Sequence, residues 1–146
     1  MIVKEMTSQP SIYIVTSSLM KDIHHKSVNF RRNSLKIIPL VIDLSNLVQV
    51  ERYIKGLVND ADPSVASGAL LAGLQMFYSN EEMIRKWGTE IVDKLNSKDE
   101  YVQYHALLLI GETKKKDMAS LKKILFSLIK QDLKGVAAVQ HLRIMR

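Results

Sequence analysis

Three stretches decide the fold: LVQVERYI (Leu47–Ile54), IRKWGTEI (Ile84–Ile91) and LKKILFSL (Leu121–Leu128). Each stretch begins 37 residues after the one before it, and each has apolar residues at its first, fourth and eighth positions. That spacing places the apolar side chains on one stripe of an α-helix. A helical unit that recurs every ~35–45 residues is typical of an α-solenoid.

A second apolar helix pattern recurs with nearly the same period. Its members are Phe30, Val65 and Val102, then the small residues Ser34, Ala69 and Ala106, and then Leu35, Leu70 and Leu107. A small residue followed by leucine is expected where a helix is buried between two neighbours. We therefore predict an all-α fold, an α-solenoid of stacked antiparallel helix pairs in a single domain over residues 1–146. The repeats are expected at about 11–42, 45–78, 81–115 and 118–145.

The breaks between the predicted helices have clear start signals. Asp62 is expected to cap a helix that has Pro63 at its first position. Asn80 is expected to cap one continuous helix over residues 81–95, and Asp99 a helix over residues 100–115. Pro39 lies inside the helix predicted over residues 29–42, where we expect it to cause a kink or an early end.

The composition restricts the classes of function. The chain is 47% apolar and 25% charged, which is ordinary for a globular protein. It has no cysteine, which excludes disulfides and thiolate metal sites. No apolar run reaches the ~18 residues of a membrane span. The net charge of +6 is compatible with acidic proteins, a phospholipid surface or nucleic acid as partner, and equally with solubility alone.

No catalytic, cofactor-binding or metal-binding residue is assigned from the sequence. A glycine-rich phosphate loop is missing, because Gly68 and Gly73 lie inside a helix pattern. The histidines are not spaced for zinc. His105 lies beside a small position of the repeat, so we expect a packed, hydrogen-bonded histidine. Since no nucleophile, base and oxyanion donor come together, an enzyme is not expected.

Two basic groups are the candidate binding residues. They lie on one expected helix and at the end of another: Arg31, Arg32, Lys36, Lys114, Lys115 and Lys116. They form either a solvated surface or a contact for a protein or lipid headgroup. Nucleic-acid binding would require aromatic residues interleaved for base stacking. Since Tyr101 and Tyr104 alone are near in sequence, nucleic acid is not expected as a partner.

Several segments resemble the coatomer gamma subunits of the COPI vesicle coat. The segments are Ile14–Asp22, Val50–Lys55, Pro63–Leu70, Ile84–Trp87, Val102–Leu107 and Lys114–Asp117. They are collinear and extend the resemblance from about Lys4 to Ser127. The chain departs from the family at Arg31-Arg32-Asn33, where the family usually has Arg-Gly-Pro, and in carrying Pro39 deeper in the helix.

The resemblance implies an internal piece of the N-terminal trunk of a longer subunit, with HEAT- and adaptin-like helix pairs. It implies a structural, non-enzymatic adaptor without cofactors, which acts in Golgi-to-ER retrograde transport. The implied partners are other coatomer subunits, the zeta subunit in particular, and an Arf-family GTPase in its GTP form. The implied location is cytoplasmic, peripheral to the Golgi membrane and COPI vesicles.

The residues by themselves leave a different class of function open. This alternative is a generic HEAT-like scaffold that binds nucleic acid or another protein through a basic face.

Overall fold

The computed structural model describes residues 10–129, Gly135, Ala138, Gln140, Arg143 and Ile144. In this part of the chain the secondary structure is helical, with no strand. The helices are α2 (Pro10–Asp22), α3 (Val28–Val41), α4 (Leu44–Leu57), α5 (Pro63–Phe77), α6 (Glu81–Arg85), α7 (Gly88–Lys94), α8 (Glu100–Thr113) and α9 (Met118–Ile129). The second half of the repeat predicted over 118–145 lies mostly outside the described residues. None of the described helices has the length and apolar character needed to cross a bilayer.

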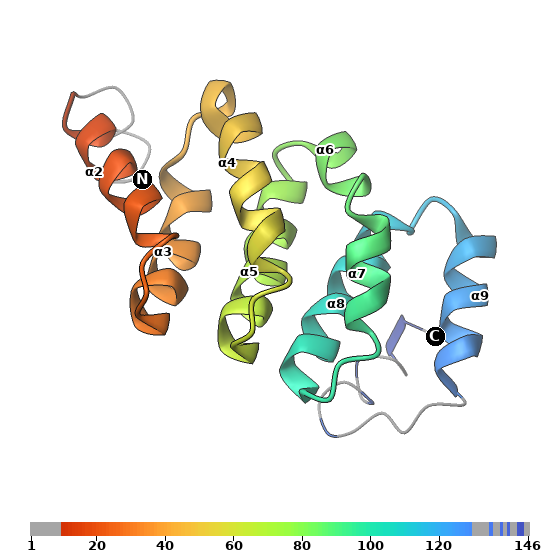
Figure 1. The fold of residues 1–146 in the computed structure, drawn as a ribbon. Coiled ribbons are helices and arrows are strands. Elements are labelled where there is room, and N and C mark those ends of the chain that lie inside the picture. The colour runs from red at the N-terminus through yellow and green to blue at the C-terminus, as the bar shows by residue number, and fades with distance from the viewer. Residues whose placement is uncertain (1–9, 130–134, 136–137, 139, 141–142, 145–146) are drawn as a thin grey trace.

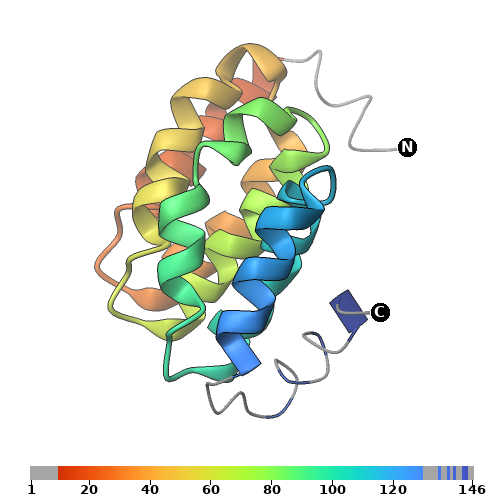
Figure 2. The ribbon, with the colours of Figure 1, turned by 90° about the vertical axis from the view of Figure 1, so that its right-hand side faces the viewer.

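The helices form two layers, which are visible in Figure 1 and from the end of the stack in Figure 2. One layer contains α2, α4 and α7, and the other contains α3, α5 and α8. Consecutive helices pair as α2–α3, α4–α5 and α7–α8, and α5 packs between α3 and α8. The predicted all-α solenoid of stacked antiparallel pairs is confirmed.

The repeated apolar stripe forms the core. Its members Leu47, Val50, Ile54, Ile84, Trp87, Ile91, Leu121 and Leu128 are all buried. Ile124 is only partly buried. Phe30 is the exception in the second pattern, because half of its surface is exposed. Its counterparts on α5 and α8 are buried, whereas α3 lies near one end of the described stack and has fewer neighbours.

The expected capping residues begin the helices as predicted. Asp62 Oδ1 accepts a hydrogen bond from the Ser64 N–H at 2.9 Å. Asn80 and Asp99 cap α6 and α8 in the same way. Pro39 lies in the last turn of α3, and the helix ends two residues later at Val41, so it comes within one residue of its predicted end and the early end expected from Pro39 does not occur.

The continuous helix predicted over residues 81–95 is wrong, because the segment forms two helices, α6 and α7. The chain turns at Lys86 and Trp87, and Trp87 takes the N-cap position of α7 with φ −82° and ψ 6°. The turn lets the Trp87 indole enter the core, where the ring is fully buried. There it lies against Gly73 of α5, where an added Cβ would be 2.6 Å from the ring.

Candidate functional site

The Arg31 guanidinium forms its hydrogen bonds with other residues of the same chain. Its Nε and Nη2 donate to the two carboxylate oxygens of Asp60 at 3.0 and 3.1 Å, and Nη1 donates to the carbonyls of His25 and Lys26 at 2.9 Å. The Arg31 and Asp60 side chains are only 16% and 11% exposed. Arg31 therefore ties the start of α3 to the loop between α4 and α5. Its role in binding a partner stays a prediction, and its guanidinium is largely occupied by these internal contacts.

Arg32 and Lys36 lie one turn apart on α3 and line a cavity of about 210 Å³. We call this cavity the α3–α5–α8 groove and define it by Arg32, Leu35, Lys36, Ser67, Leu71 and Gln75. His105 of α8 lies at the same groove. Arg32 Nη2 donates to Asn29 Oδ1 at 3.4 Å, whereas Arg32 Nε is buried without a hydrogen-bond partner. The same is true of Gln75 Oε1.

Ser67 and His105 connect α5 to α8 at this groove. Ser67 Oγ lies 2.6 Å from His105 Nδ1, and Ser67 is buried. Burial lowers the pKa of His105, and a hydrogen bond with the backbone of Tyr101 raises it by less. Burial thus favours the neutral form of the ring. The prediction of a packed, hydrogen-bonded histidine is confirmed.

The three lysines Lys114, Lys115 and Lys116 follow α8 and lie near carboxylates. Lys116 Nζ is 3.4 Å from Glu81 Oε2, and Lys115 Nζ is 4.0 Å from Glu112 Oε2. The charge of Lys116 is the main cause that lowers the pKa of Glu81. Exposed pairs of this kind contribute about 0–1 kcal/mol. The acidic neighbours make this end of α8 a mixed-charge surface.

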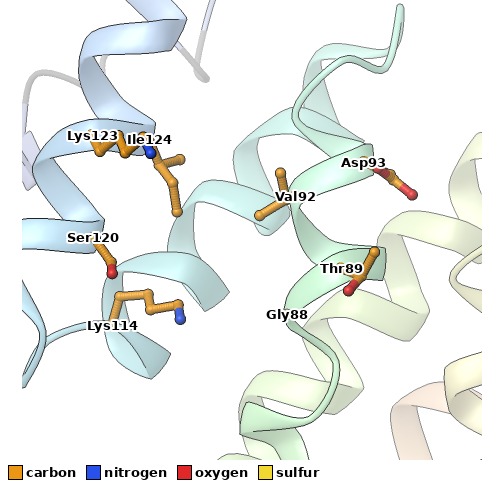
Figure 3. Close-up of a pocket in the computed structure, with 8 residues that line it drawn as sticks. All are labelled: Gly88, Thr89, Val92, Asp93, Lys114, Ser120, Lys123 and Ile124. Carbon is orange, nitrogen blue, oxygen red and sulfur yellow. The ribbon is translucent and has the colours of Figure 1, made fainter.

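A second cavity, of about 510 Å³, lies between α7 and α9 (Figure 3). Its lining includes Val92 and Asp93 of α7, Lys114, and Ser120, Lys123 and Ile124 of α9. Val92 and Ile124 point toward one another across the gap between the helices. An apolar floor with charges of both signs suits a polypeptide contact. Lys114 is the predicted binding residue that lines this cavity.

The two predicted basic groups do not form one surface. Arg31, Arg32 and Lys36 lie in the first two-thirds of α3, whereas Lys114 and its neighbours follow the last residue of α8. Both helices run in the same direction, with α5 between them (Figure 1). The first group therefore lies near the first helices of the stack and toward the start of α3. The second group lies near the last helices and beyond the end of α8.

Two polar links join α4 to α7 and its N-cap residue, and neither is predicted by the apolar pattern. The indole Nε1–H of Trp87 donates to Glu51 Oε1. Lys55 Nζ pairs with Glu90 Oε1 at 2.9 Å, and this hydrogen bond lowers the pKa of Glu90. The partners are separated by 36 residues in the first link and by 35 in the second. Both separations are close to the repeat period, and this period was the sequence signal from which the links could have been found.

The described residues contain no group of three or more histidine, aspartate or glutamate side chains that could hold a metal ion. The features found there are helix ridges, grooves and inter-repeat links. This chemistry suits the recognition of another polypeptide.

The family model for the adaptin N-terminal region matches residues 2–144 of this chain. The chain belongs to the adaptin N-terminal family. The match covers all the described helices, so the similarity rests on the whole adaptin-like stack. The six candidate basic residues lie within the matched range, and their role in binding stays a prediction.

The curated relatives include coatomer gamma subunits from distant organisms. Coatomer subunit gamma of Dictyostelium discoideum is 35% identical over 144 residues, which are 97% of this chain and 16% of the relative. The Arabidopsis thaliana subunit is 34% identical over 139 residues, 94% of this chain and 16% of the relative. Coatomer subunit gamma-1 of Homo sapiens is 32% identical over 134 residues, 91% of this chain and 15% of the relative. The resemblance to coatomer gamma is confirmed, and this adaptin-family chain spans about one-sixth of these relatives.

Proposed function

We propose that this chain is a segment of a structural, adaptor-like subunit of the COPI vesicle coat, without catalytic activity of its own. The observation that carries the proposal is the similarity to coatomer gamma subunits over 91–97% of the chain. The fold supports it, because stacked helix pairs provide a continuous core and long exposed faces. A coat subunit needs such faces to hold its neighbours in fixed positions.

The proposed partners are other coatomer subunits, the zeta subunit in particular, and an Arf-family GTPase in its GTP form. Through the coat, the subunit would contact the cytosolic side of the Golgi membrane and take part in Golgi-to-ER retrograde transport. A preformed scaffold suits such recruitment, because it loses little conformational freedom on binding. The nucleotide dependence then comes from the GTPase, whose two forms must differ in affinity for the scaffold.

Among the basic residues, Arg32, Lys36 and the lysines after α8 are the proposed contacts. Lys36, Lys115 and Lys116 have exposed side chains. Arg31 contributes mainly by holding the start of α3 in place, because its guanidinium is bound to Asp60. Contacts at the two basic groups would therefore use separate parts of the stack.

Co-assembly with the zeta subunit tests the proposed function. The complete subunit that contains this segment is expected to form a stable heterodimer with purified zeta subunit in size-exclusion chromatography with light scattering. A variant with Leu47→Asp and Ile84→Asp should lose the heterodimer if zeta binding depends on this part of the stack, because it places charges in the core. Circular dichroism shows whether the unmodified subunit is folded. A folded subunit that stays monomeric with excess zeta would contradict the proposal.

The alternative of nucleic-acid binding makes a distinct prediction for the same protein. A binder that contacts phosphates would lose affinity for generic RNA steeply with salt, by about 0.7 in log–log slope for each phosphate contacted. The separation of the two basic groups, and the acidic partners of Lys115 and Lys116, disfavour this alternative.

A further inference from the structure

The α3–α5–α8 groove contains a cationic donor without an acceptor in the described part of the chain. Arg32 Nε is buried and unpartnered, and Gln75 Oε1 is a buried acceptor without a donor in the same groove. Buried polar groups in folded proteins nearly always have hydrogen-bond partners. The free-energy cost of leaving such a group unpaired is greatest when the group is charged. Both atoms are closed to solvent, so the Arg32 and Gln75 side chains would turn toward the groove for a ligand there to accept from Arg32 and donate to Gln75.

The charge of the groove favours an anionic acceptor. Arg32 and Lys36 are the charged residues in its lining, and both are positive. Lys36 is exposed and has no ion-pair partner among the described residues. The central helix α5 has no charged residue along its whole length. A carboxylate in this groove would form charge-assisted hydrogen bonds with little competition from nearby acids.

The size and walls of the groove indicate that the carboxylate belongs to a polypeptide. Its volume of about 210 Å³ is below the roughly 300–1,000 Å³ of small-molecule pockets, and it suits one side chain. Leu35 and Leu71 provide apolar walls, and Leu71 is 36% exposed. A backbone N–H of the same polypeptide would supply a donor for Gln75 Oε1.

We propose that the α3–α5–α8 groove docks a glutamate or aspartate side chain of a partner protein, presented by a segment with apolar flanking residues. A membrane or nucleic acid fits less well, because both are bound by rows of exposed cations. Neither α5 nor α8 contains a lysine or arginine. The proposal does not depend on the coat function, since it rests on the groove alone.

Selection of short peptides tests the proposal on the 146-residue chain. One display library has glutamate fixed at its centre between apolar or small residues, and a matched library has glutamine there. Glutamate peptides should be enriched, and glutamine peptides should not. The best peptide is then titrated against the unmodified chain and its variants. Equal enrichment of both libraries, or no enrichment of either, would overturn the proposal.

Three variants and one control assign the binding to the groove. Arg32→Gln should weaken the best peptide about tenfold or more. Leu71→Glu should weaken it similarly, because it places a competing carboxylate at the groove. Arg52→Gln, an exposed arginine on α4, is the control and should leave the affinity unchanged. If thermal unfolding shows that Arg32→Gln does not fold, Lys36→Gln replaces it and should also weaken binding.

Unchanged affinity in the folded groove variants would overturn the proposal. So would Arg32-dependent binding to phosphatidylserine vesicles that exceeds peptide binding, because it would assign the groove to a lipid headgroup. Failure of the subunit to bind zeta would leave these results unaffected, so the two proposals fail independently.

Discussion

Replacing Trp87 with alanine is expected to lower the free energy of unfolding by about 3–5 kcal/mol. The indole is fully buried, and its N–H donates to Glu51, so the substitution leaves a cavity and removes a link between α4 and α7. Urea denaturation followed by circular dichroism measures the change. A loss below about 1 kcal/mol would contradict the central position of Trp87 in the stack.

Alanine substitutions at Gly73 and Gly56 test the contact between Trp87 and Gly73, with Gly56 as the matched control. In the unmodified chain, Gly73→Ala would bring the new methyl group within 2.6 Å of the ring, and overpacking of this kind costs about 1–3 kcal/mol. In the Trp87→Ala background the methyl group has space, so the same substitution should stabilise the helix by up to about 1 kcal/mol. Gly56→Ala, which meets no atom within 4 Å, should have the same effect in both backgrounds. An equal effect of Gly73→Ala in both would contradict the packing.

Reversing the charge of Arg31 with Arg31→Glu is expected to lower the free energy of unfolding by about 3 kcal/mol. The substitution removes the hydrogen bonds to Asp60, His25 and Lys26 and places two carboxylates at a site where Asp60 is 11% exposed. Thermal and urea denaturation measure the loss. Arg52→Glu is the exposed control on α4 and should change stability by no more than about 0.5 kcal/mol.

A second substitution separates the ion pair from general effects of charge. Asp60→Arg in the Arg31→Glu background restores opposite charges and should recover part of the lost stability. An Arg31→Glu variant as stable as Arg52→Glu would show that the ion pair contributes little. If the loss is as large as expected, reduced binding in Arg31 variants reports unfolding, and Arg32 and Lys36 are the residues with which to test partner contacts.

The stack was predictable from the sequence because burial repeats with the chain. Leu47, Ile84 and Leu121 occupy equivalent places in successive repeats, and all three are buried. The helix starts were predictable because aspartate and asparagine caps act within three residues. Contacts between repeats follow the period as well: Ser67 and His105 are 38 residues apart, and Glu51 and Trp87 are 36 apart. These pairs could have been found by searching one repeat further along the chain, within one residue of the equivalent position.

The break between α6 and α7 could not be predicted from the apolar pattern. Lys86 has φ −70° and ψ −10°, and Trp87 has φ −82° and ψ 6°, so ψ leaves the α-helical value near about −42° at both residues. Ile84, Trp87 and Ile91 nevertheless have the sequence spacing of one helix face, and all three are buried. The indole packs against Gly73 of α5, and this tertiary contact is not encoded in the apolar pattern.

Which of the candidate site residues can reach a ligand depends on tertiary structure still more than the break between α6 and α7 does. Arg31 and Arg32 are adjacent and chemically identical, yet one is bound to Asp60 and the other lines a groove with an unpartnered Nε. The Arg31 partner is 29 residues away, a separation that does not match the repeat. The sequence could identify a basic group, but it could not show which of its members is available to a ligand.

Nucleotide-dependent binding of an Arf-family GTPase tests the proposed coat function most directly. The complete subunit, assembled with zeta, is titrated with the GTPase bound to a non-hydrolysable GTP analogue and, in parallel, to GDP. We expect saturable binding of the GTP form and an affinity for the GDP form at least about tenfold lower, which corresponds to about 1.4 kcal/mol. Equal affinity for the two forms, with the assembled complex folded, would contradict the proposed recruitment.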